Sequence, residues 1–392
     1  MAAHLYEWLA LAIRWLHVIA GIAWIGDSFY FMWLDASLKR DESTPDGVKG
    51  ESWAVHGGGF YRVIKFVNAP AEMPAQLHWF KWQAYTTWLS GFALLCVVYW
   101  LQAKAWMVDV DGVGPGPAVA IGAGTVFGGW LLYTALCKSP LGKKPVALAV
   151  ALGAVIAGVA YGLGEVLAPR AAYIHVGAMI GTWMAGNVAM IIIPNQRKIV
   201  AALMDGKVPD PKYGAESKLR STHNNYLTLP VIFVMISNHY PSTYGHEYAW
   251  AVLVGLFAVG ALTRVFFNFK NAGRVLGWVL PVATVAYIAL AVMTAPSPSV
   301  PADGVTATWA DVEPIIAAHC VSCHSATPTH PIFRTAPNGV MYDTPEQVAT
   351  KAAMIKIRAV NTATMPLANE TNMTAEERVV LGAWIDAGAV IP

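Results

Sequence analysis

The pattern Cys320-x-x-Cys323-His324 has the most specific chemistry in this chain of 392 residues. A C-x-x-C-H sequence is typical of c-type haem attachment, in which both thiols bond to the macrocycle and the adjacent histidine becomes an axial ligand of the iron. Half of a zinc site is the alternative, but the other cysteines, Cys96 and Cys137, stand alone in apolar runs. We therefore predict one covalently bound haem c at this pattern.

A second axial ligand has to come from further along the chain. Met365 is the predicted ligand, because Pro366 after it fixes a turn that could aim the sulfur. A thioether ligand would also raise the reduction potential of the iron. Met354, Met373 and, for a bis-histidine site, His330 are the alternatives.

Four histidines at or within apolar segments form a second chemical group. His17 and His175 begin similar stretches and lie 175 − 17 = 158 residues apart, while His78 and His223 lie 223 − 78 = 145 apart. This weak internal similarity predicts two four-helix halves in parallel orientation. Ionisable residues within a membrane are costly, and imidazole is a suitable ligand for haem b or another redox metal. The alternative is that each histidine is a hydrogen-bonded residue of the bundle.

Amides, tryptophan and arginine gather where several apolar segments end on the same side. An arginine fork, amides that recognise ring heteroatoms and a stacking indole together suit a small planar anion. An ordinary interfacial belt with snorkelling cations is the alternative. The predicted substrate-binding residues are Arg264, Asn224, Asn225, Asn268, Trp82 and Gln83, and the predicted catalytic residues are His78, His223 and Arg264.

The composition indicates that these residues are positioned by membrane-spanning helices. Apolar residues make up 56% of the chain and charged residues only 13%, which excludes an ordinary soluble protein. We predict an all-α fold, with a polytopic bundle of eight spans and a small C-terminal c-type cytochrome domain. The predicted spans are 8–38, 79–101, 118–137, 146–164, 171–194, 223–240, 248–269 and 274–294.

The distribution of lysine and arginine predicts the orientation of the spans. The connections after the first, third, fifth and seventh spans are rich in these residues, whereas the opposite connections hold only Lys104 and Arg170. Positive residues stay on the cytoplasmic side. Both termini, and with them the cytochrome domain, are therefore predicted to lie in the periplasm of a bacterial inner membrane.

Changes of composition predict the domain boundaries. We assign residues 1–295 to the membrane domain, 296–304 to a proline-rich linker and 305–392 to the cytochrome domain. The first apolar run is long and lacks a basic start, so we expect it to be a retained span. Three short helices are also predicted: 60–66 at the interface, 309–319 before the haem motif and 378–387 at the end, the last led by a helix start at Thr374-Ala375-Glu376-Glu377. Trp384 is expected to pack against the helix before the motif.

Taken together, these motifs resemble the membrane-bound urate oxidases that carry a C-terminal cytochrome c domain (PuuD type), over the whole chain. The residues that carry the resemblance are Arg14-Trp15-Leu16-His17, Gly21 to Gly26, the His56-Gly57-Gly58-Gly59 loop, His223-Asn224-Asn225-Tyr226 and the motif from Cys320 to His324. The resemblance implies oxidation of urate to 5-hydroxyisourate, with electrons passing through the C-terminal haem to a respiratory-chain acceptor. Its implied partners are thus urate, that acceptor and the lipid bilayer, with no nucleic acid.

Two other functions are compatible with parts of the sequence. A membrane-anchored cytochrome that only carries electrons would need the haem motif, but eight spans are many for an anchor. A transporter with a redox sensor would suit the parallel repeat, but the spans lack the broken helices expected at a transport site. If urate binds at the inner face, its electrons have to cross about 30 Å of hydrocarbon, so the bundle would need a redox relay.

Overall fold

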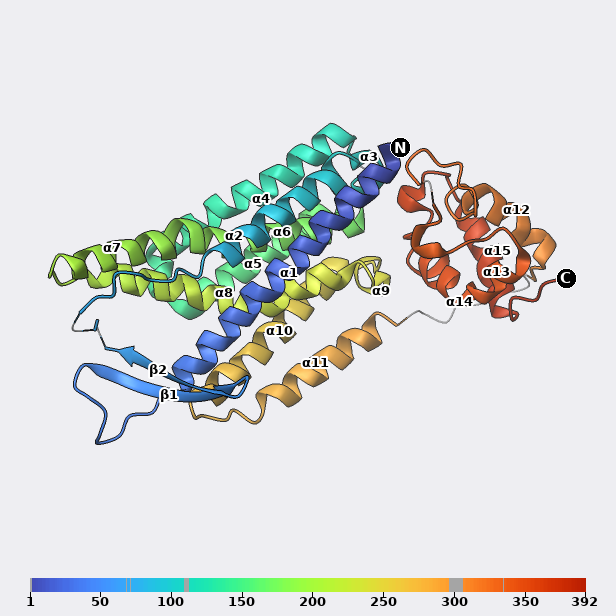
Figure 1. The fold of residues 1–392 in the computed structure, drawn as a ribbon. Helices are drawn as coiled ribbons and strands as arrows, with labels where there is room; N and C mark the ends of the chain where they lie inside the picture. Colours follow the sequence, from blue (N-terminus) through green and yellow to red (C-terminus); the bar gives the residue numbers. More distant parts are fainter. Residues whose placement is uncertain (1, 68, 71, 109–112, 296–305, 334) are drawn as a thin grey trace.

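The computed structural model describes residues 2–67, 69–70, 72–108, 113–295, 306–333 and 335–392. The chain forms an elongated helical bundle with a smaller C-terminal unit at one end (Figure 1). The predicted linker, 296–304, and the first residue of the predicted cytochrome domain lie outside the described residues.

The first helix and a β-hairpin begin the chain. Helix α1 (Ala2–Ser37) is followed by β1 (Val48–His56) and β2 (Gly59–Phe66), which pair antiparallel. The predicted mainly helical architecture is confirmed, but the all-α prediction did not include this hairpin, and the predicted helix over 60–66 is wrong. The loop between the strands is Gly57-Gly58, with φ of 58° and 78°, and two residues with positive φ make the tight turn that suits a hairpin.

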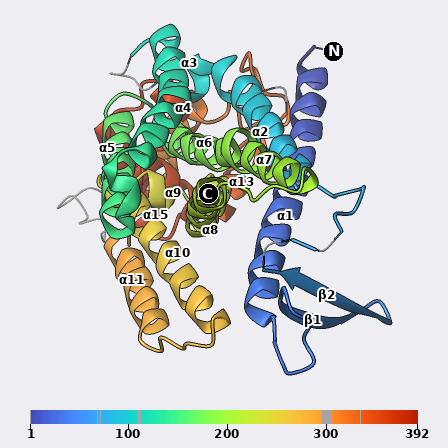
Figure 2. The ribbon, with the colours of Figure 1, turned by 90° about the vertical axis from the view of Figure 1, so that its left-hand side faces the viewer.

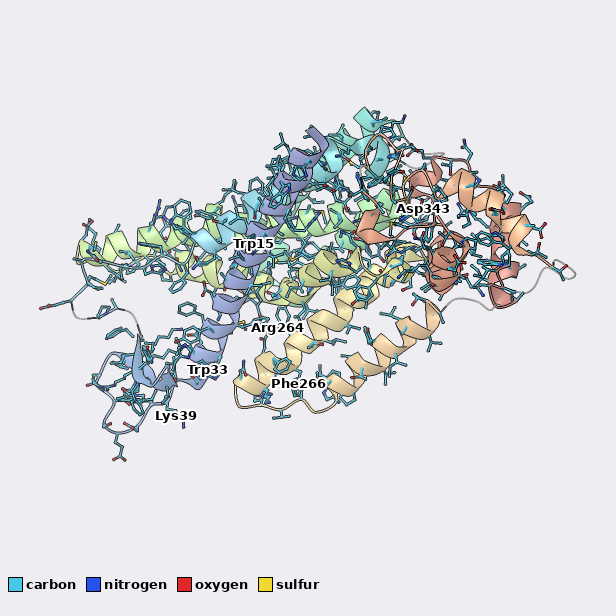
Figure 3. The ribbon with its side chains drawn as sticks, turned by 45° about the vertical axis from the view of Figure 1, so that its right-hand side comes forward. Trp15, Trp33, Lys39, Arg264, Phe266 and Asp343 are labelled. Atoms are coloured by element: carbon cyan, nitrogen blue, oxygen red, sulfur yellow. The ribbon has the colours of Figure 1, made fainter. Side chains whose placement is uncertain are left out.

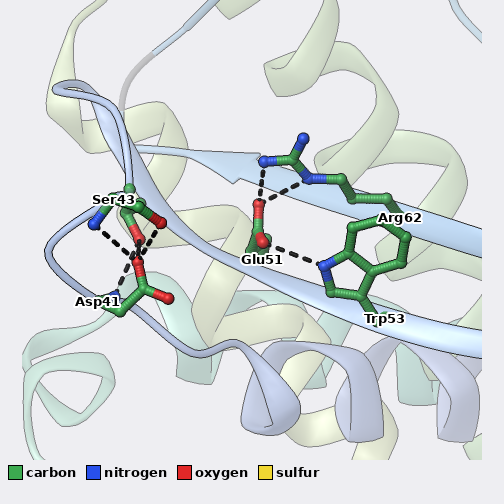
Figure 4. Close-up of polar contacts among 6 residues, drawn as sticks. Asp41, Ser43, Glu51, Trp53 and Arg62 are labelled. Atoms are coloured by element: carbon green, nitrogen blue, oxygen red, sulfur yellow. Dashed lines mark hydrogen bonds and ion pairs between the residues drawn. The ribbon is translucent and has the colours of Figure 1, made fainter.

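Hydrogen bonds between polar side chains join β1 and β2 on the exposed face of the hairpin (Figure 4). Glu51 of β1 accepts hydrogen bonds from Arg62 of β2 and from Nε1 of Trp53, the latter at 3.1 Å. These bonds, that from Arg62 first, lower the pKa of the Glu51 carboxyl. In the turn before β1, Oδ1 of Asp41 accepts from the backbone N–H of Ser43 at 2.9 Å. The hairpin thus has its own polar contacts away from the bundle.

Among the described residues, five helical segments are long and apolar enough to cross a membrane. They are His4–Ser37 in α1, Pro115–Lys138 (α4), Pro145–Gly164 (α5), the continuous segment Pro169–Met204 and Ala249–Asn271 (α10). Helices also lie at the other three predicted spans: α2 (Trp82–Leu94) with η1 (Leu95–Trp100), α8 (Pro211–Ser237) and α11 (Val279–Met293). These three are shorter or more polar, so the predicted count of eight spans stays a prediction.

Helix α6 (Pro169–Gly186) lies at the centre of the bundle. Most of its side chains are buried, including Trp183 and His175 at 0% exposure. It continues through the π-helix η3 (Asn187–Ile192) into α7 (Ile193–Met204). Viewed along the bundle, α6 and α8 lie between α1 on one side and α4, α5, α10 and α11 on the other (Figure 2). Small residues of α6 allow this close packing, since a Cβ on Gly177 would lie 2.4 Å from Val234 of α8.

The C-terminal unit is built from short helices around one core. They are α12 (Trp309–His319), η4 (Pro337–Gly339), α13 (Pro345–Thr350), α14 (Ala352–Ile355), η5 (Lys356–Asn361), η6 (Leu367–Asn369) and α15 (Ala375–Asp386). Helix α12 has the predicted bounds, and α15 begins at Ala375, within the predicted helix start at 374–377. Trp384 of α15 packs against Trp309 of α12 with ring centroids 5.6 Å apart, as predicted. Both predicted helices therefore contribute to the core of this unit.

The C-terminal unit docks on the end of the bundle that holds the start of α1 and the short helices α3 (Ala103–Trp106) and α9 (Pro241–Tyr244) (Figure 1). The rings of Trp106 and Phe333 meet at 6.0 Å, and Oγ1 of Thr335 donates to Oε1 of Glu7 at 3.3 Å. The hairpin and α7 lie toward the opposite end. The connections predicted to be outside therefore share one end of the bundle with the C-terminal unit.

Candidate functional site

The Cys320-x-x-Cys323-His324 pattern follows directly on α12, whose start is fixed by a capping box between Thr308 and Asp311. Both cysteines are free, and burial raises the pKa of Cys320 to about 12 and also raises that of Cys323. Nδ1 of His324 lies 3.0 Å from the carbonyl oxygen of Val340. A carbonyl only accepts, so Nδ1 carries the proton and Nε2 keeps its lone pair for a metal. The residues present therefore fit a covalently bound haem.

The predicted second ligand, Met365, lines the same cavity as His324. Arg378 of α15 holds its loop, because NH1 donates to the carbonyl oxygen of Met365 at 2.8 Å and NH2 donates to Oδ1 of Asn369 at 3.1 Å. Burial is the main cause of a lowered pKa of Arg378. The backbone of the predicted ligand is thus tied to the closing helix.

The alternative ligands have different surroundings. Both ring nitrogens of His330 are engaged: Nδ1 accepts from the backbone N–H of Ile332 at 3.2 Å, and Nε2 lies 3.0 Å from Oε1 of Glu370. Met373 is 3% exposed and packs in the core of the unit, whereas Met354 is 47% exposed. All three also line the cavity. These surroundings favour Met365 over His330, and the identity of the second ligand stays a prediction.

One cavity of about 2520 Å³ joins the C-terminal unit to the bundle. Its C-terminal part is lined by Cys320, Cys323 and His324. Its other part runs along α1, α2 and α6 and is lined by His17 and Trp88 among others. The haem motif therefore opens into the same cavity as residues of α1, α2 and α6.

Among the predicted intramembrane ligands, His17 is the one that lines this cavity. Its Nδ1 lies 3.0 Å from the carbonyl oxygen of Thr87 and 3.1 Å from Oγ of Ser90, both on α2. The carbonyl requires a proton on Nδ1, which leaves Nε2 unprotonated. His175, its predicted repeat partner, instead has Nδ1 at 2.8 Å from the oxygen of Ala171 and accepts the indole N–H of Trp100 on Nε2 at 3.0 Å.

His223 belongs to a buried polar group between α4, η3 and α8. Its Nδ1 lies 2.8 Å from the hydroxyl of Tyr133, which also accepts from Nδ2 of Asn187 at 2.8 Å. Arg220, one turn before His223, lies over the Tyr133 ring at 5.0 Å and donates to Oδ1 of Asn187 at 3.4 Å. Asn224 accepts from Asn187 at 2.9 Å and completes what we term the Arg220 group.

Among the described residues, some hydrogen-bond donors in and beside the Arg220 group have no partner. Arg220 is 1% exposed, and among the described residues its Nε has no partner and no carboxylate lies within ion-pair distance. Nε1 of buried Trp183, whose ring stacks on Tyr133 at 4.8 Å, is also unpartnered there. Nδ2 of Asn224 donates to the carbonyl oxygen of Met184, a residue of the cavity wall, at 3.0 Å. The group therefore offers spare donors directly behind the cavity.

Arg264 of α10 lies toward α1 (Figure 3) and forms a second group. Its Nε donates to Oδ1 of Asn225 at 2.8 Å, and NH2 donates to Oδ1 of Asn268 at 3.3 Å. NH2 also contacts the sulfur of Met32 at 3.1 Å, and the guanidinium lies 4.4 Å from the ring of Phe29. We term these five residues the Arg264 group. It ties α1, α8 and α10 together.

The structure brings together only part of the predicted substrate and catalytic set. Arg264, Asn225 and Asn268 meet, and His223 meets Asn224 through Tyr133 and Asn187. His78 is exposed before the start of α2 and its ring packs on Phe80 at 4.6 Å. Trp82 is 65% exposed with Lys81 over its ring at 5.4 Å, and Gln83 is only partly buried. Among the described residues, no hydrogen bond, ion pair or ring contact joins His78, Trp82 or Gln83 to either arginine group.

Sequence reasoning missed Arg220, Asn187 and Tyr133. Arg220 was assigned to a basic connection, yet it lies three residues before His223, a spacing that shares one face of a helix. Because α8 begins at Pro211, well before the predicted span, this face continues to Arg220. Asn187 is an isolated amide within an apolar run, which is the signal that a buried polar contact needs a partner.

Comparison with known protein families gives a match to the bundle. Residues 3–295 of the 392 match the family described as urate oxidase N-terminal, and the match ends where the described bundle ends. No curated protein and no solved structure matches the chain. The chain thus belongs to the urate oxidase N-terminal family.

Proposed function

We propose that this protein oxidises urate to 5-hydroxyisourate within the bundle and delivers the electrons to haem c in its C-terminal unit. One observation carries the proposal. A bundle that belongs to the urate oxidase N-terminal family and a complete haem-attachment motif line the same cavity. Membership of the family supports an oxidoreductase that acts on urate, and the shared cavity supports an internal electron acceptor.

The reaction balances without oxygen as a direct reactant. Urate and one water give 5-hydroxyisourate, two protons and two electrons. Haem held by Cys320, Cys323, His324 and Met365 would accept these electrons one at a time and pass them to a respiratory-chain acceptor. Two successive transfers therefore complete each turnover, and the two protons have to leave through groups of the bundle.

The proposed substrate residues lie in the two arginine groups. Arg264 with Asn225 and Asn268 supplies a guanidinium fork and amides for a planar anion. His223 is the proposed base, and a positioned base contributes about 10²–10⁴-fold to a rate. Arg220 joins the proposed set, because it lies one turn from His223 and its Nε is unpartnered among the described residues.

The proposed location is a bacterial inner membrane, with the N-terminus and C-terminal unit in the periplasm. Long apolar helices support a membrane protein. The proposed orientation rests on the lysines and arginines, which are concentrated in connections away from the docked C-terminal unit.

Anaerobic mixing of urate with the purified, oxidised full chain tests the function. We expect the absorption of haem c to change from the ferric to the ferrous form, with 5-hydroxyisourate as the product. Xanthine, which has the same ring system without the C8 oxygen, is the matched control ligand. If haem c stays ferric with urate but is reduced by dithionite, the proposed urate oxidation is wrong, and the protein would only carry electrons.

A further inference from the structure

The cavity extends far beyond the residues that fit haem c. Its volume of about 2520 Å³ exceeds the ~300–1,000 Å³ of a usual small-molecule site. Residues of α1 from Tyr6 to Gly26 line it, and 20 residues of helix span about 30 Å. The part within the bundle therefore has room for a second group of considerable size.

His17 presents a free ligand atom to this inner part. Its protonated Nδ1 is held by Thr87 and Ser90, which leaves the lone pair of Nε2 without a protein partner among the described residues. His324 shows the same arrangement at the other end of the cavity, with Nδ1 bonded to a carbonyl. A histidine that ligates a metal usually donates its other ring N–H to a carbonyl or carboxylate. His17 thus has the bonding pattern of a prepared ligand.

The walls around His17 are flat and apolar. Trp88 is fixed by a hydrogen bond from its indole N–H to Thr182 at 3.0 Å and stacks on Phe92 at 5.2 Å with the rings 6° apart. Gly91 lets the imidazole lie against α2, because a Cβ there would be 2.7 Å from Cε1 of His17. Such walls suit a broad, planar, largely apolar group better than a small polar substrate.

Cations at the outer end of the cavity suit the acidic edge of such a group. Arg14 lies three residues before His17, about one turn closer to the C-terminal unit, and lines the cavity. No carboxylate lies within ion-pair distance of it among the described residues. Arg170 lines the same end, where its Nε donates to Oδ1 of Asn238.

We propose that the inner part of the cavity binds a non-covalent haem, with Nε2 of His17 as an axial ligand and Arg14 beside its propionates. A haem combines the features that the site accommodates: a flat apolar macrocycle, a metal that takes imidazole, and two carboxylates on one edge. Haem at this place would carry single electrons between the proposed substrate residues and haem c. Only this role rests on the proposed function; the binding of haem does not.

Haem analysis of the purified full chain tests the proposal directly. We expect two haems per chain, of which acid acetone extracts one as haem b and leaves the other covalently bound. The pyridine haemochrome spectrum should show both types in equal amounts. A single, non-extractable haem c would overturn the proposal. That result would leave the proposed function standing if urate still reduced haem c.

Substitution of His17 identifies the ligand. In the His17→Gly variant we expect the extractable haem to be lost or its spectrum to change, and added imidazole to restore the wild-type spectrum. His175→Gln is the matched control, because Nε2 of His175 already accepts from Trp100, and this variant should keep both haems. Should His17→Gly fail to accumulate, Gly91→Leu tests the same contact by displacing the ring. Two unchanged haem spectra in either His17→Gly or Gly91→Leu would contradict ligation by His17.

Discussion

The Arg220 and Arg264 groups use the same residue types on two sides of α8, but they leave different chemistry available. His223, Asn224 and Asn225 follow one another, and each step along a helix turns the side chain by about 100°. Asn225 therefore reaches Arg264, while His223 reaches Tyr133 on another side. Two neighbouring amides of one helix thus belong to two separate groups.

The hydrogen bonds show how the two arginines differ. Arg264 donates from Nε and NH2 to amide oxygens and rests on Phe29, so most of its fork is engaged. The hydrogen bond of Arg220 to Asn187 is long, at 3.4 Å, and its Nε has no partner within the part of the chain that the structure describes. A buried charge without a counter-ion is costly, and intramembrane charges usually mark functional sites. The comparison teaches that Arg220 is better prepared to receive an anion, whereas Arg264 also has a structural role.

Replacement of Arg220 should have the largest effect on turnover. Loss of one partner of a buried charged hydrogen bond costs about 2–5 kcal/mol, which corresponds to at least about twenty-five-fold at about 1.4 kcal/mol per tenfold. We therefore expect Arg220→Gln to lower kcat/KM for urate by more than about twenty-five-fold. Steady-state kinetics with the full chain measure this effect, and dithionite should still reduce haem c. Lys218→Gln, on the exposed face of α8, is the control. An unchanged kcat/KM in Arg220→Gln would remove this residue from the site.

Arg264→Ala should also collapse urate turnover, by about tenfold to a hundredfold, while the haem c spectrum persists. The substitution removes the proposed fork and leaves the amide oxygen of buried Asn225 without its donor, at a cost of about 1–3 kcal/mol. Turnover and thermal stability should therefore fall together, unlike in Arg220→Gln. Arg274→Gln, at an exposed position, controls for loss of charge. Normal turnover in Arg264→Ala would assign this arginine to structure alone.

A negative charge placed beside Arg220 or Arg264 tests which of the two arginines binds the substrate anion. Asn225→Asp keeps the shape of the side chain but pairs an anion with Arg264, and Asn224→Asp does the same near Arg220. We expect each variant to raise KM for urate about tenfold, as about 1.4 kcal/mol of lost anion binding requires. The rate is measured as a function of urate concentration to give KM and kcat, and the haem content of each variant is determined on the same samples. If only Asn224→Asp raises KM, the substrate anion binds on the Arg220 side of α8.

The C-terminal unit could be predicted closely because its signals are local. The haem motif, the helix 309–319 and the start near Thr374 each lie within a few adjacent residues, and the structure has helices at these places. Capping and attachment motifs depend on neighbours in sequence. The packing of Trp384 on α12 followed from the apolar face of a single helix.

The bundle could be predicted only in outline, because its sites join distant segments. Apolar length indicated where helices lie, but not that α8 would extend to Pro211 and carry Arg220 inward. Tyr133 and Asn187 meet across 54 residues, and no spacing rule predicts such a contact. The hairpin was missed because Gly57-Gly58 was considered a loop, although two glycines between β-rich runs also signal a tight turn.

Removal of a helix cap in the C-terminal unit, far from both arginines, should have the smallest effect on urate turnover. It shows how much turnover changes when only stability is lowered. Oγ1 of Thr374 accepts from the backbone N–H of Glu377, whose carboxylate accepts in return from the backbone N–H of Thr374. Loss of such a cap costs about 1 kcal/mol, so Thr374→Ala should lower the denaturant midpoint of the haem absorbance without changing kcat/KM for urate. Thr350→Ala, within α13, is the control substitution. The hydrogen bond from the backbone N–H of Thr374 also lowers the pKa of the Glu377 carboxyl. The stabilisation by the ionised carboxylate is therefore present at neutral pH and should be lost as the pH falls through that lowered pKa. A tenfold loss of turnover in Thr374→Ala would mean that stability alone changes activity, and the two arginine effects would then need correction by that amount.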